Sequence, residues 1–232
     1  MNGAVERFDE NARRAAGAHG RTLIHPGELL RHPVYTRIVH WTSAAFFILA
    51  LLSGFAVYTP WMFHALTPLF GGGALTRLLH PWFGLGFCLA FTFQILNWLS
   101  QMTWTADDTR WMRRLGDYVN NTEDCEPEYV GFFNGGQKAY FWAIALSIIL
   151  FLISGVPMWF PETFGRITVD IGYVVHDLAA LVMLGGFVIH IYEGTAAQPG
   201  TFRSMTRGTV ERRWAWTHHP AWFRRITGAD KP

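Results

Sequence analysis

Long apolar runs, separated by short polar segments, dominate the pattern of this chain. Four of these runs carry almost no charge, and they are His40–Tyr58, His80–Leu99, Ala139–Phe160 and Ile171–Tyr192. Each has about the 20 residues that an α-helix needs to cross the hydrocarbon core of a bilayer. The pattern therefore predicts an all-α membrane protein, a bundle of four transmembrane helices over about residues 37–58, 78–100, 137–160 and 169–193.

The polar segments divide the rest of the chain. Residues 1–32 combine Ala, Gly and Arg without an apolar period, which predicts a flexible N-terminal extension. They lack the apolar core and cleavage site of a secretory signal, so we expect the first span to stay in the mature protein. Residues 33–200 form the expected membrane domain. Residues 201–232 mix arginine with tryptophan, which predicts an amphipathic tail on the membrane surface.

Lys and Arg are unevenly distributed between the ends of the predicted spans. They gather in the N-terminal segment, in the loop after the second span and in the C-terminal tail, whereas the other two loops contain only Arg77 and Arg166. The positive-inside rule then places both termini and the central loop in the cytoplasm. The net charge of +2 by itself implies no nucleic-acid partner.

Composition restricts the possible cofactors. Only 16% of the residues are charged, against about a quarter in an average soluble domain, which again favours a membrane protein. Cys88, in the second span, and Cys125, in a polar loop, are too few for an iron–sulfur cluster or a Cys-based metal site. The chain also lacks the C-x-x-C-H motif that attaches c-type haem. Any redox cofactor held by this chain must therefore be bound by histidine.

Four histidines lie near the ends of the predicted spans. His176 and His190 are fourteen residues apart in the fourth span, so they share one helix face about 21 Å apart along the axis. His40 lies at the cytoplasmic end of the first span and His80 opens the second span on the outer side. Depth pairs His40 with His190 and His80 with His176. A lone histidine at a span end is more often an interfacial residue, but two pairs at two depths predict the axial ligands of two haem b groups.

Small residues near these histidines suggest where a porphyrin would press on a helix. Gly54 lies on the face of His40 at the outer level, Gly84 is one turn after His80, and Gly186 shortly precedes His190. These glycines are candidates for haem packing, although small residues also let membrane helices approach each other.

Two arginines each precede a predicted ligand by three residues. Arg37 and Arg77 lie at the membrane edge, where a guanidinium can pair with a haem propionate. They can equally act as topogenic charges or contact lipid phosphates. Pro81, directly after His80, is expected to open the second helix because proline suits the first helical position.

The remaining histidines show no pairing pattern. We expect surface roles for His25, His32 and His64, which lie outside the spans. His218 and His219, in the tail rich in Trp and Arg, suit a partner or lipid contact better than a metal site.

Several motifs in this chain match one family in combination. They are Arg37-x-x-His40-Trp41, Ser53-Gly54, Arg77-x-Leu79-His80-Pro81, Asn134-Gly135-Gly136-Gln137-Lys138, His176, His190, and the tail Arg212-Arg213-Trp214-Ala215 with His218-His219-Pro220. Over roughly residues 33–225 the chain resembles the cytochrome b (gamma) subunit of membrane-bound formate dehydrogenases.

The resemblance implies an electron-transfer subunit of an enzyme whose formate oxidation is on another subunit. It implies an iron–sulfur beta subunit as electron donor, fed by a molybdenum or tungsten catalytic alpha subunit. Electrons would reach the outer haem (His80, His176), then the inner haem (His40, His190), and reduce quinone on the cytoplasmic side of the bacterial inner membrane. The resemblance also implies contact with membrane lipids and leaves room for a higher oligomer of the complex.

The resemblance further implies a quinone site before the third span. In the family, the positions of Asn134 and Gly136 line the quinone pocket, and that of His190 serves both haem and quinone. Asn134 and Gln137 can donate to a quinone carbonyl, and Lys138 can favour the reduced anion. A loop with a helix-start signal would also use Asn and Gly, so this alternative stays open.

Other functions remain to be weighed against this one. The cytochrome b of a nickel–iron hydrogenase, or of another molybdenum oxidoreductase, would use the same four histidines. A histidine-based metal transporter would show no Soret band and would usually carry acidic or His residues in mid-span. A haem-free structural anchor would leave the paired depths unexplained.

Overall fold

The structure is a computed structural model that describes residues 27–120 and 126–232. The chain divides into two compact units. The bundle unit consists of Ile38–Trp98 and Ala143–Val188, and the tail unit consists of the remaining segments, Met1–Arg37, Leu99–Trp142 and Ile189–Pro232. Residues 1–26, which make up most of the predicted extension, and 121–125, which include Cys125, lie outside the described residues.

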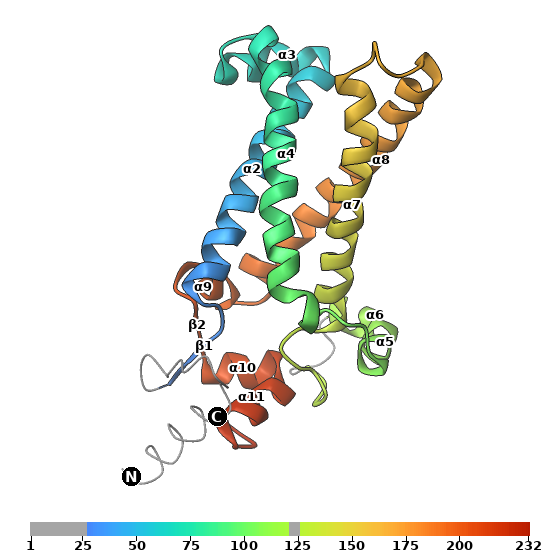
Figure 1. The fold of residues 1–232 in the computed structure, drawn as a ribbon. Coiled ribbons are helices and arrows are strands. Elements are labelled where there is room, and N and C mark those ends of the chain that lie inside the picture. Colours follow the sequence, from blue (N-terminus) through green and yellow to red (C-terminus); the bar gives the residue numbers. More distant parts are fainter. Residues whose placement is uncertain (1–26, 121–125) are drawn as a thin grey trace. The chain divides into compact units, whose positions relative to one another are not determined.

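Four long helices confirm the predicted spans (Figure 1). They are α2 (Val34–Tyr58), α4 (Gly73–Trp98), α7 (Gly135–Trp159) and α8 (Arg166–Tyr192). By length and composition, each can cross a membrane. Apolar side chains on their outer faces, such as Leu89, Leu152 and Val182, are exposed, as lipid-facing residues are. A helix satisfies its backbone hydrogen bonds internally, which a chain in lipid requires.

The start of the second span differs from the expectation. Helix α4 begins at Gly73, and Pro81 lies inside it rather than at its first position. Proline lacks the N–H that would bond to the carbonyl four residues earlier, but a membrane helix tolerates this loss when neighbouring groups compensate. His80 consequently lies about two turns inside α4.

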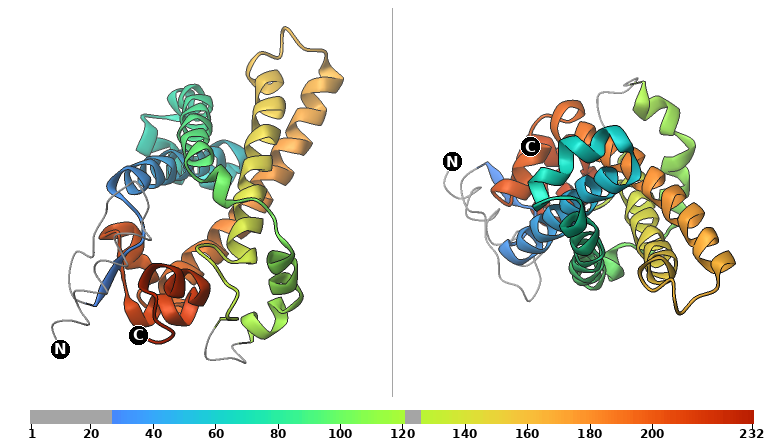
Figure 2. Two further views of the ribbon diagram at one scale, coloured as in Figure 1. Left: turned by 60° about the horizontal axis from the view of Figure 1, so that its bottom comes forward. Right: turned by 90° about the horizontal axis from the view of Figure 1, so that it is seen from above.

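Aromatic contacts connect the helices of the bundle unit. Phe47 of α2 packs against Phe87 of α4 and Phe187 of α8, with ring centroids 5.5 and 5.1 Å apart. Trp82 of α4 meets Trp159 of α7 at 5.2 Å. Helices α7 and α8 approach closely, because a Cβ on Gly172 would lie 3.0 Å from the carbonyl oxygen of Ser154. The two views of Figure 2 show α2 beside α4 and α7 beside α8.

A short connection joins α2 to α4 in the bundle unit. It contains α3 (Pro60–Leu66) and the 3-10 helix η2 (Thr67–Phe70). Gly71 ends this segment with φ of 84°, a left-handed conformation that favours glycine. His64 lies here with an exposed side chain, as expected for a surface histidine.

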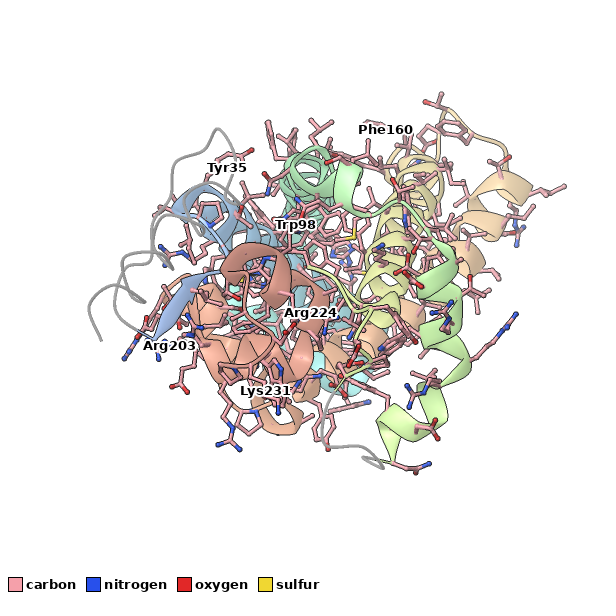
Figure 3. The ribbon with its side chains drawn as sticks, turned by 90° about the horizontal axis from the view of Figure 1, so that it is seen from below. Tyr35, Trp98, Phe160, Arg203, Arg224 and Lys231 are labelled. Atoms are coloured by element: carbon pink, nitrogen blue, oxygen red, sulfur yellow. The ribbon has the colours of Figure 1, made fainter. Side chains whose placement is uncertain are left out.

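The tail unit contains the short elements of the chain. They are strand β1 (Glu28–Leu30), η3 (Leu99–Gln101), α5 (Ala106–Arg113), α6 (Leu115–Val119), the π-helical turn η4 (Glu193–Ala197), α9 (Thr201–Thr206), strand β2 (Thr209–Glu211), α10 (Arg212–His218) and α11 (Pro220–Thr227). Strands β1 and β2 pair antiparallel, with Leu29 opposite Val210. Arg203, labelled in Figure 3, forms an ion pair with Glu28 of β1.

A small apolar core joins β1, β2, α10 and α11. It consists of Leu29, Val210, Trp214, Ala215, Trp222 and Phe223. The expectation of a flexible extension up to residue 32 is therefore wrong for Glu28–Leu30, which form β1. Part of the predicted amphipathic tail is likewise a folded core, because tryptophans that suit a membrane surface can also pack against each other.

A buried arginine lies beside this core. Arg31 is 4% exposed, and its guanidinium lies over the rings of Phe132 and Trp222. It donates hydrogen bonds to the carbonyl oxygen of Phe132 and to Nε2 of His219, with 3.1 Å to the imidazole. His32 is buried, so the surface role expected for it is wrong, and His219, expected to contact a partner or lipid, is buried as well. Their burial depends on contacts between segments far apart in the sequence.

Candidate haem and quinone sites

The bundle unit brings two of the four predicted haem ligands together. His80 of α4 and His176 of α8 lie with ring centroids 6.2 Å apart and planes inclined by 64°. Helix positions account for this, since each imidazole projects inward from a different helix at the same level. Phe151 of α7 packs on the His176 ring at 4.9 Å. We call His80 and His176 the outer pair.

One serine side chain contacts Nδ1 of each ring in the outer pair. Ser53 Oγ of α2 lies 3.0 Å from Nδ1 of His80, and Ser154 Oγ of α7 lies 3.0 Å from Nδ1 of His176. Nδ1 is thus engaged in both rings. The nitrogen left for a metal ion is Nε2.

The outer pair fits a six-coordinate haem iron. Two imidazole nitrogens at about 2 Å from one metal ion place their ring centroids roughly 6 Å apart, close to the observed separation. Within the described residues there is no group of three or more His, Cys, Asp or Glu side chains suited to a metal ion. A haem needs only two protein ligands, because the porphyrin supplies the other four. Ligation by these residues stays a prediction.

Glycines next to the serines make room for the rings. A Cβ on Gly54 would lie 3.2 Å from Cε1 of His80, and one on Gly155 would lie 3.6 Å from Cε1 of His176. Gly54 was predicted as a haem contact, whereas its nearest described neighbour is the ligand ring. A Cβ on Gly84 would meet nothing within 4 Å, and Gly186 lies in α8 four residues before His190.

Ser154 and Gly155 were missed at the level of sequence. The signal that could have found them is the repeated Ser-Gly pair, at Ser53-Gly54 and again at Ser154-Gly155. A dipeptide this short is informative only when the structure shows each copy next to a histidine.

The inner ligands fall in different units. His40 of α2 belongs to the bundle unit and packs edge-on against Trp41 at 5.2 Å. His190 of α8 belongs to the tail unit and stacks on Tyr140 of α7 at 5.3 Å, with an interplanar angle of 20°. Their pairing around an inner haem stays a prediction.

The two arginines proposed for propionates have other contacts in the structure. Arg37 Nη1 donates to the carbonyl oxygen of Thr206 at 2.7 Å. Arg77 is exposed, with its guanidinium carbon 5.7 Å from the ring centroid of Phe63. Pairing of either guanidinium with a propionate stays a prediction.

The motif at the start of α7 forms a reciprocal helix cap. Oδ1 of Asn134 accepts a hydrogen bond from the backbone N–H of Gln137 at 2.9 Å. The backbone N–H of Asn134 donates to Oε1 of Gln137 at 3.1 Å. The amide Nδ2 of Asn134 donates to Glu126 at 3.1 Å. The helix-start explanation of this motif is therefore correct, and these bonds leave a quinone role untested.

The glycines of this motif accommodate an indole. A Cβ on Gly136 would lie 2.8 Å from the Trp111 ring, and a Cβ on Gly135 would lie 2.8 Å from the carbonyl oxygen of Asp108. Trp111 is itself held by a hydrogen bond from its Nε1 to Glu126 at 2.7 Å. The two glycines thus let the backbone approach Trp111 closely.

Lys138 forms a buried ion pair. Its ammonium donates to Asp108 at 2.8 Å and to the carbonyl oxygen of Thr103 at 3.0 Å. Burial alone would raise the pKa of Asp108, but hydrogen bonds from Lys138 and Thr105 outweigh it, so that the pKa is lowered. Lys138 therefore faces a carboxylate that stays ionised at neutral pH.

A cavity of about 320 Å³ adjoins this ion pair. Its walls include Asn134, Gly135, Lys138, Asp108 and Trp111. Of the residues predicted to bind quinone, Asn134 and Lys138 thus line one cavity of the tail unit. Gly136 and Gln137 stabilise the helix start beside it.

Four spanning helices, with two imidazoles 6.2 Å apart between them, define the class of membrane cytochromes b. The model of the family described as prokaryotic cytochrome b561 matches residues 31–208, and the chain belongs to this family.

Curated relatives are similar over most of their length. The cytochrome b556(Fdn) subunit of the nitrate-inducible formate dehydrogenase of Escherichia coli (strain K12) is 31% identical over 205 residues, which are 87% of this chain and 93% of the relative. The cytochrome b556(fdo) subunit of the same organism is 31% identical over 201 residues, 85% and 93% of the two chains. The formate dehydrogenase cytochrome b556 subunit of Haemophilus influenzae is 29% identical over 199 residues, 84% and 82% of the two chains.

Proposed function

We propose that this chain is the dihaem cytochrome b subunit of a formate dehydrogenase complex. It carries electrons from an iron–sulfur subunit across the bacterial inner membrane to quinone on the cytoplasmic side. The observation that supports this most directly is the outer pair, His80 and His176, at a separation that fits one iron between them. The names of the relatives support formate dehydrogenase as the parent enzyme.

The four histidines hold two haem groups at two depths. When bound, haem b supplies a one-electron Fe(III)/Fe(II) couple at each level. His80 and His176 would hold the outer haem, and His40 with His190 would hold the inner one. Gly186 and Gly84 give the porphyrins room against α8 and α4, and Arg37 and Arg77 balance propionate charge at the membrane edges.

Quinone reduction takes place beside the start of α7. Asn134 and Lys138 line a cavity of the tail unit, and Lys138 brings a buried cation that favours a reduced quinone anion. Gln137 and Gly136 contribute by holding Asn134 in place through the helix cap and the Trp111 contact. His190 provides both an iron ligand and a polar group for the quinone.

Orientation gives the reaction a physiological consequence. Both termini and the central loop lie in the cytoplasm, according to the distribution of Lys and Arg. Formate oxidation outside and proton uptake at the inner quinone site then separate charge across the membrane. The molybdenum or tungsten catalytic subunit lies on the outer side of the complex.

A reduced-minus-oxidised optical spectrum of the purified complex, with haem counted per chain, tests this proposal. We expect b-type haem at two per chain, together with co-purified iron–sulfur and catalytic subunits that oxidise formate. Absence of a Soret band would reject the cytochrome and favour a metal transporter or a haem-free anchor. If a hydrogenase or a different molybdenum enzyme co-purified instead, formate dehydrogenase would be rejected as the parent enzyme, but the cytochrome b assignment would stand.

The variant His40→Ala tests the assignment of levels. It should remove the inner haem and stop quinone reduction, while formate-dependent reduction of a dye continues at the catalytic subunit. Retention of both haems in His40→Ala would show that the pairing is wrong.

A further inference from the structure

Each imidazole of the outer pair meets one serine from a neighbouring helix. Ser53 of α2 contacts Nδ1 of His80 on α4, and Ser154 of α7 contacts Nδ1 of His176 on α8, both at 3.0 Å. Figure 1 shows the two pairs of helices, α2 beside α4 and α7 beside α8. The same contact is therefore made twice, once in each pair of helices.

The hydroxyl hydrogens decide the direction of these hydrogen bonds. Ser53 Oγ donates to the carbonyl oxygen of Leu49 at 2.7 Å, and Ser154 Oγ donates to that of Leu150 at 2.6 Å. A hydroxyl carries only one hydrogen but two acceptor lone pairs. With that hydrogen given to the backbone carbonyl, each serine accepts the second hydrogen bond and Nδ1 of each histidine donates it.

This direction determines the tautomer of both histidines. The proton lies on Nδ1, so the lone pair of the neutral ring lies on Nε2, which is the nitrogen available to iron. Ser53 is 0% and Ser154 is 2% exposed, so water does not compete for these bonds. Histidines that bind metals generally donate their second N–H to such a partner, which orients the ring and raises its basicity.

The glycine after each serine completes the arrangement. Gly54 and Gly155 leave the space in which Cε1 of His80 and of His176 lies, at 3.2 and 3.6 Å from an added Cβ. The serine thus orients the ring and the glycine admits it. A side chain at either glycine would compete with the imidazole for the position that the serine enforces.

We propose that Ser53 and Ser154 are positioning residues for the outer haem. Their hydroxyls hold the Nδ1–H groups of His80 and His176, direct both Nε2 atoms toward the iron and increase electron donation to it. This rests on the proposed function, in which the outer pair ligates haem. Greater donation stabilises Fe(III), so both serines lower the reduction potential of the outer haem.

The test uses Ser53→Ala and Ser154→Ala in the purified complex, with redox titration of both haems. A hydrogen bond of this kind is worth about a two- to tenfold change in an equilibrium constant. We expect the Fe(III)/Fe(II) ratio of the outer haem to shift toward Fe(II) by that factor in each variant, and a tenfold shift equals about 59 mV for one electron. The potential of the inner haem should stay unchanged.

Two further variants separate positioning from structure. Ser147→Ala in α7 is the matched control, because Ser147 is 2% exposed and donates to the carbonyl four residues back at 2.8 Å, as Ser154 does. It should leave both potentials unchanged. Ser154→Thr keeps the hydroxyl, so the outer haem should have its wild-type potential in this variant. If Ser154 acted only through packing, the extra methyl group of Thr would disturb the site as the alanine does.

The outcomes distinguish this proposal from the proposed function. Wild-type potentials and full haem content in both alanine variants would overturn the positioning role and leave the haem assignment intact. A wild-type chain without haem absorption would overturn the proposed function itself. If the Ser53→Ala complex does not assemble, Ser53→Cys replaces it, because sulfur is a weak hydrogen-bond acceptor. The reduction potential of the outer haem should then rise in Ser53→Cys as expected for Ser53→Ala. An unchanged potential in Ser53→Cys would count against the proposal.

Discussion

A histidine in a membrane helix can ligate iron only when one ring nitrogen keeps its lone pair and the other is held in place. His80 and His176 meet this condition, since a buried serine accepts a hydrogen bond from Nδ1 of each. The depth of the two rings follows from residue spacing, and a helical projection predicts it. Their serine partners lie on other helices, and the repeated Ser-Gly pair in the sequence does not by itself assign a serine to a histidine.

Two glycines of the bundle unit differ in what surrounds them, and this gives a prediction for single residues. Gly54→Ala places a Cβ 3.2 Å from the His80 ring, so the imidazole must shift by a few tenths of an ångström. We expect the affinity for the outer haem to fall roughly tenfold. This is the lower end of the loss in metal affinity that follows when a group supporting a metal ligand is changed. Titration of haem into the haem-depleted complex measures it.

Gly84→Ala in α4 tests the proposed contact of Gly84 with a porphyrin. An added Cβ there meets nothing within 4 Å, and replacing a helical Gly by Ala stabilises a helix by up to about 1 kcal/mol. Unchanged outer-haem affinity in Gly84→Ala would show that Gly84 is not a porphyrin contact. A loss of haem affinity equal to that of Gly54→Ala would support the proposed haem packing of Gly84.

At the scale of elements, hydropathy alone predicts the four spans, because burial in lipid makes each helix a local property of its own residues. The exact ends depend on other contacts. Helix α4 begins about two turns before Pro81. The start of α7 is determined by the reciprocal cap between Asn134 and Gln137. Each residue of the motif Asn134–Lys138 therefore has a structural role at the start of α7. The sequence alone did not distinguish these roles from quinone binding.

The side chain of Asn134 combines two roles that a substitution can separate. Asn134→Ser keeps an oxygen that accepts from the N–H of Gln137, so α7 should lose little stability. It removes the amide donor, so quinone reduction should fall if that donor reaches a quinone carbonyl. Formate-to-quinone activity and the thermal unfolding temperature measure the two effects.

Asn134→Ala provides the comparison for this variant. It removes cap and donor together and should cost about 1 kcal/mol of helix stability in addition to any loss of activity. Full quinone reduction in Asn134→Ser, together with reduced stability in Asn134→Ala, would confine Asn134 to the helix cap.

At the scale of the whole molecule, acid should destabilise the tail unit. Burial lowers the pKa of His218 to about 4, with a contribution from Arg31, and burial with the Arg31 charge also lowers the pKa of His219. A group with a lower pKa in the folded than in the unfolded chain binds fewer protons when folded. The stability from both histidines is therefore present above about pH 6.5 and lost as the pH falls toward 4.

Hydrogen exchange in α10 and α11 across this pH range checks the expectation. Exchange should accelerate as the pH falls from 6.5 to 4, beyond the intrinsic effect of pH. His219→Gln should weaken this acceleration, whereas His64→Gln, at an exposed position in the bundle unit, should leave it unchanged. The same acid response in wild type and His219→Gln would show that His219 does not contribute to it.

Orientation in the membrane is a second property of the whole molecule. Because Arg77 and Arg166 are the only basic residues in the two outer loops, both termini should lie in the cytoplasm. A green fluorescent protein fused after Pro232 should be fluorescent, and alkaline phosphatase inserted after Leu66 should be active. The reverse pattern would contradict the direction of electron transfer proposed above.

The sequence alone determined the four long apolar helices and the spacing of the histidines along them. These properties follow from hydropathy, composition and helical rise, which depend only on neighbouring residues. Tertiary structure decided which hydroxyl accepts from each imidazole, that Glu28–Leu30 pair with Thr209–Glu211, and that Arg31 lies buried against His219. Those contacts join residues from 22 to 188 positions apart, and the packing of whole elements brings them together.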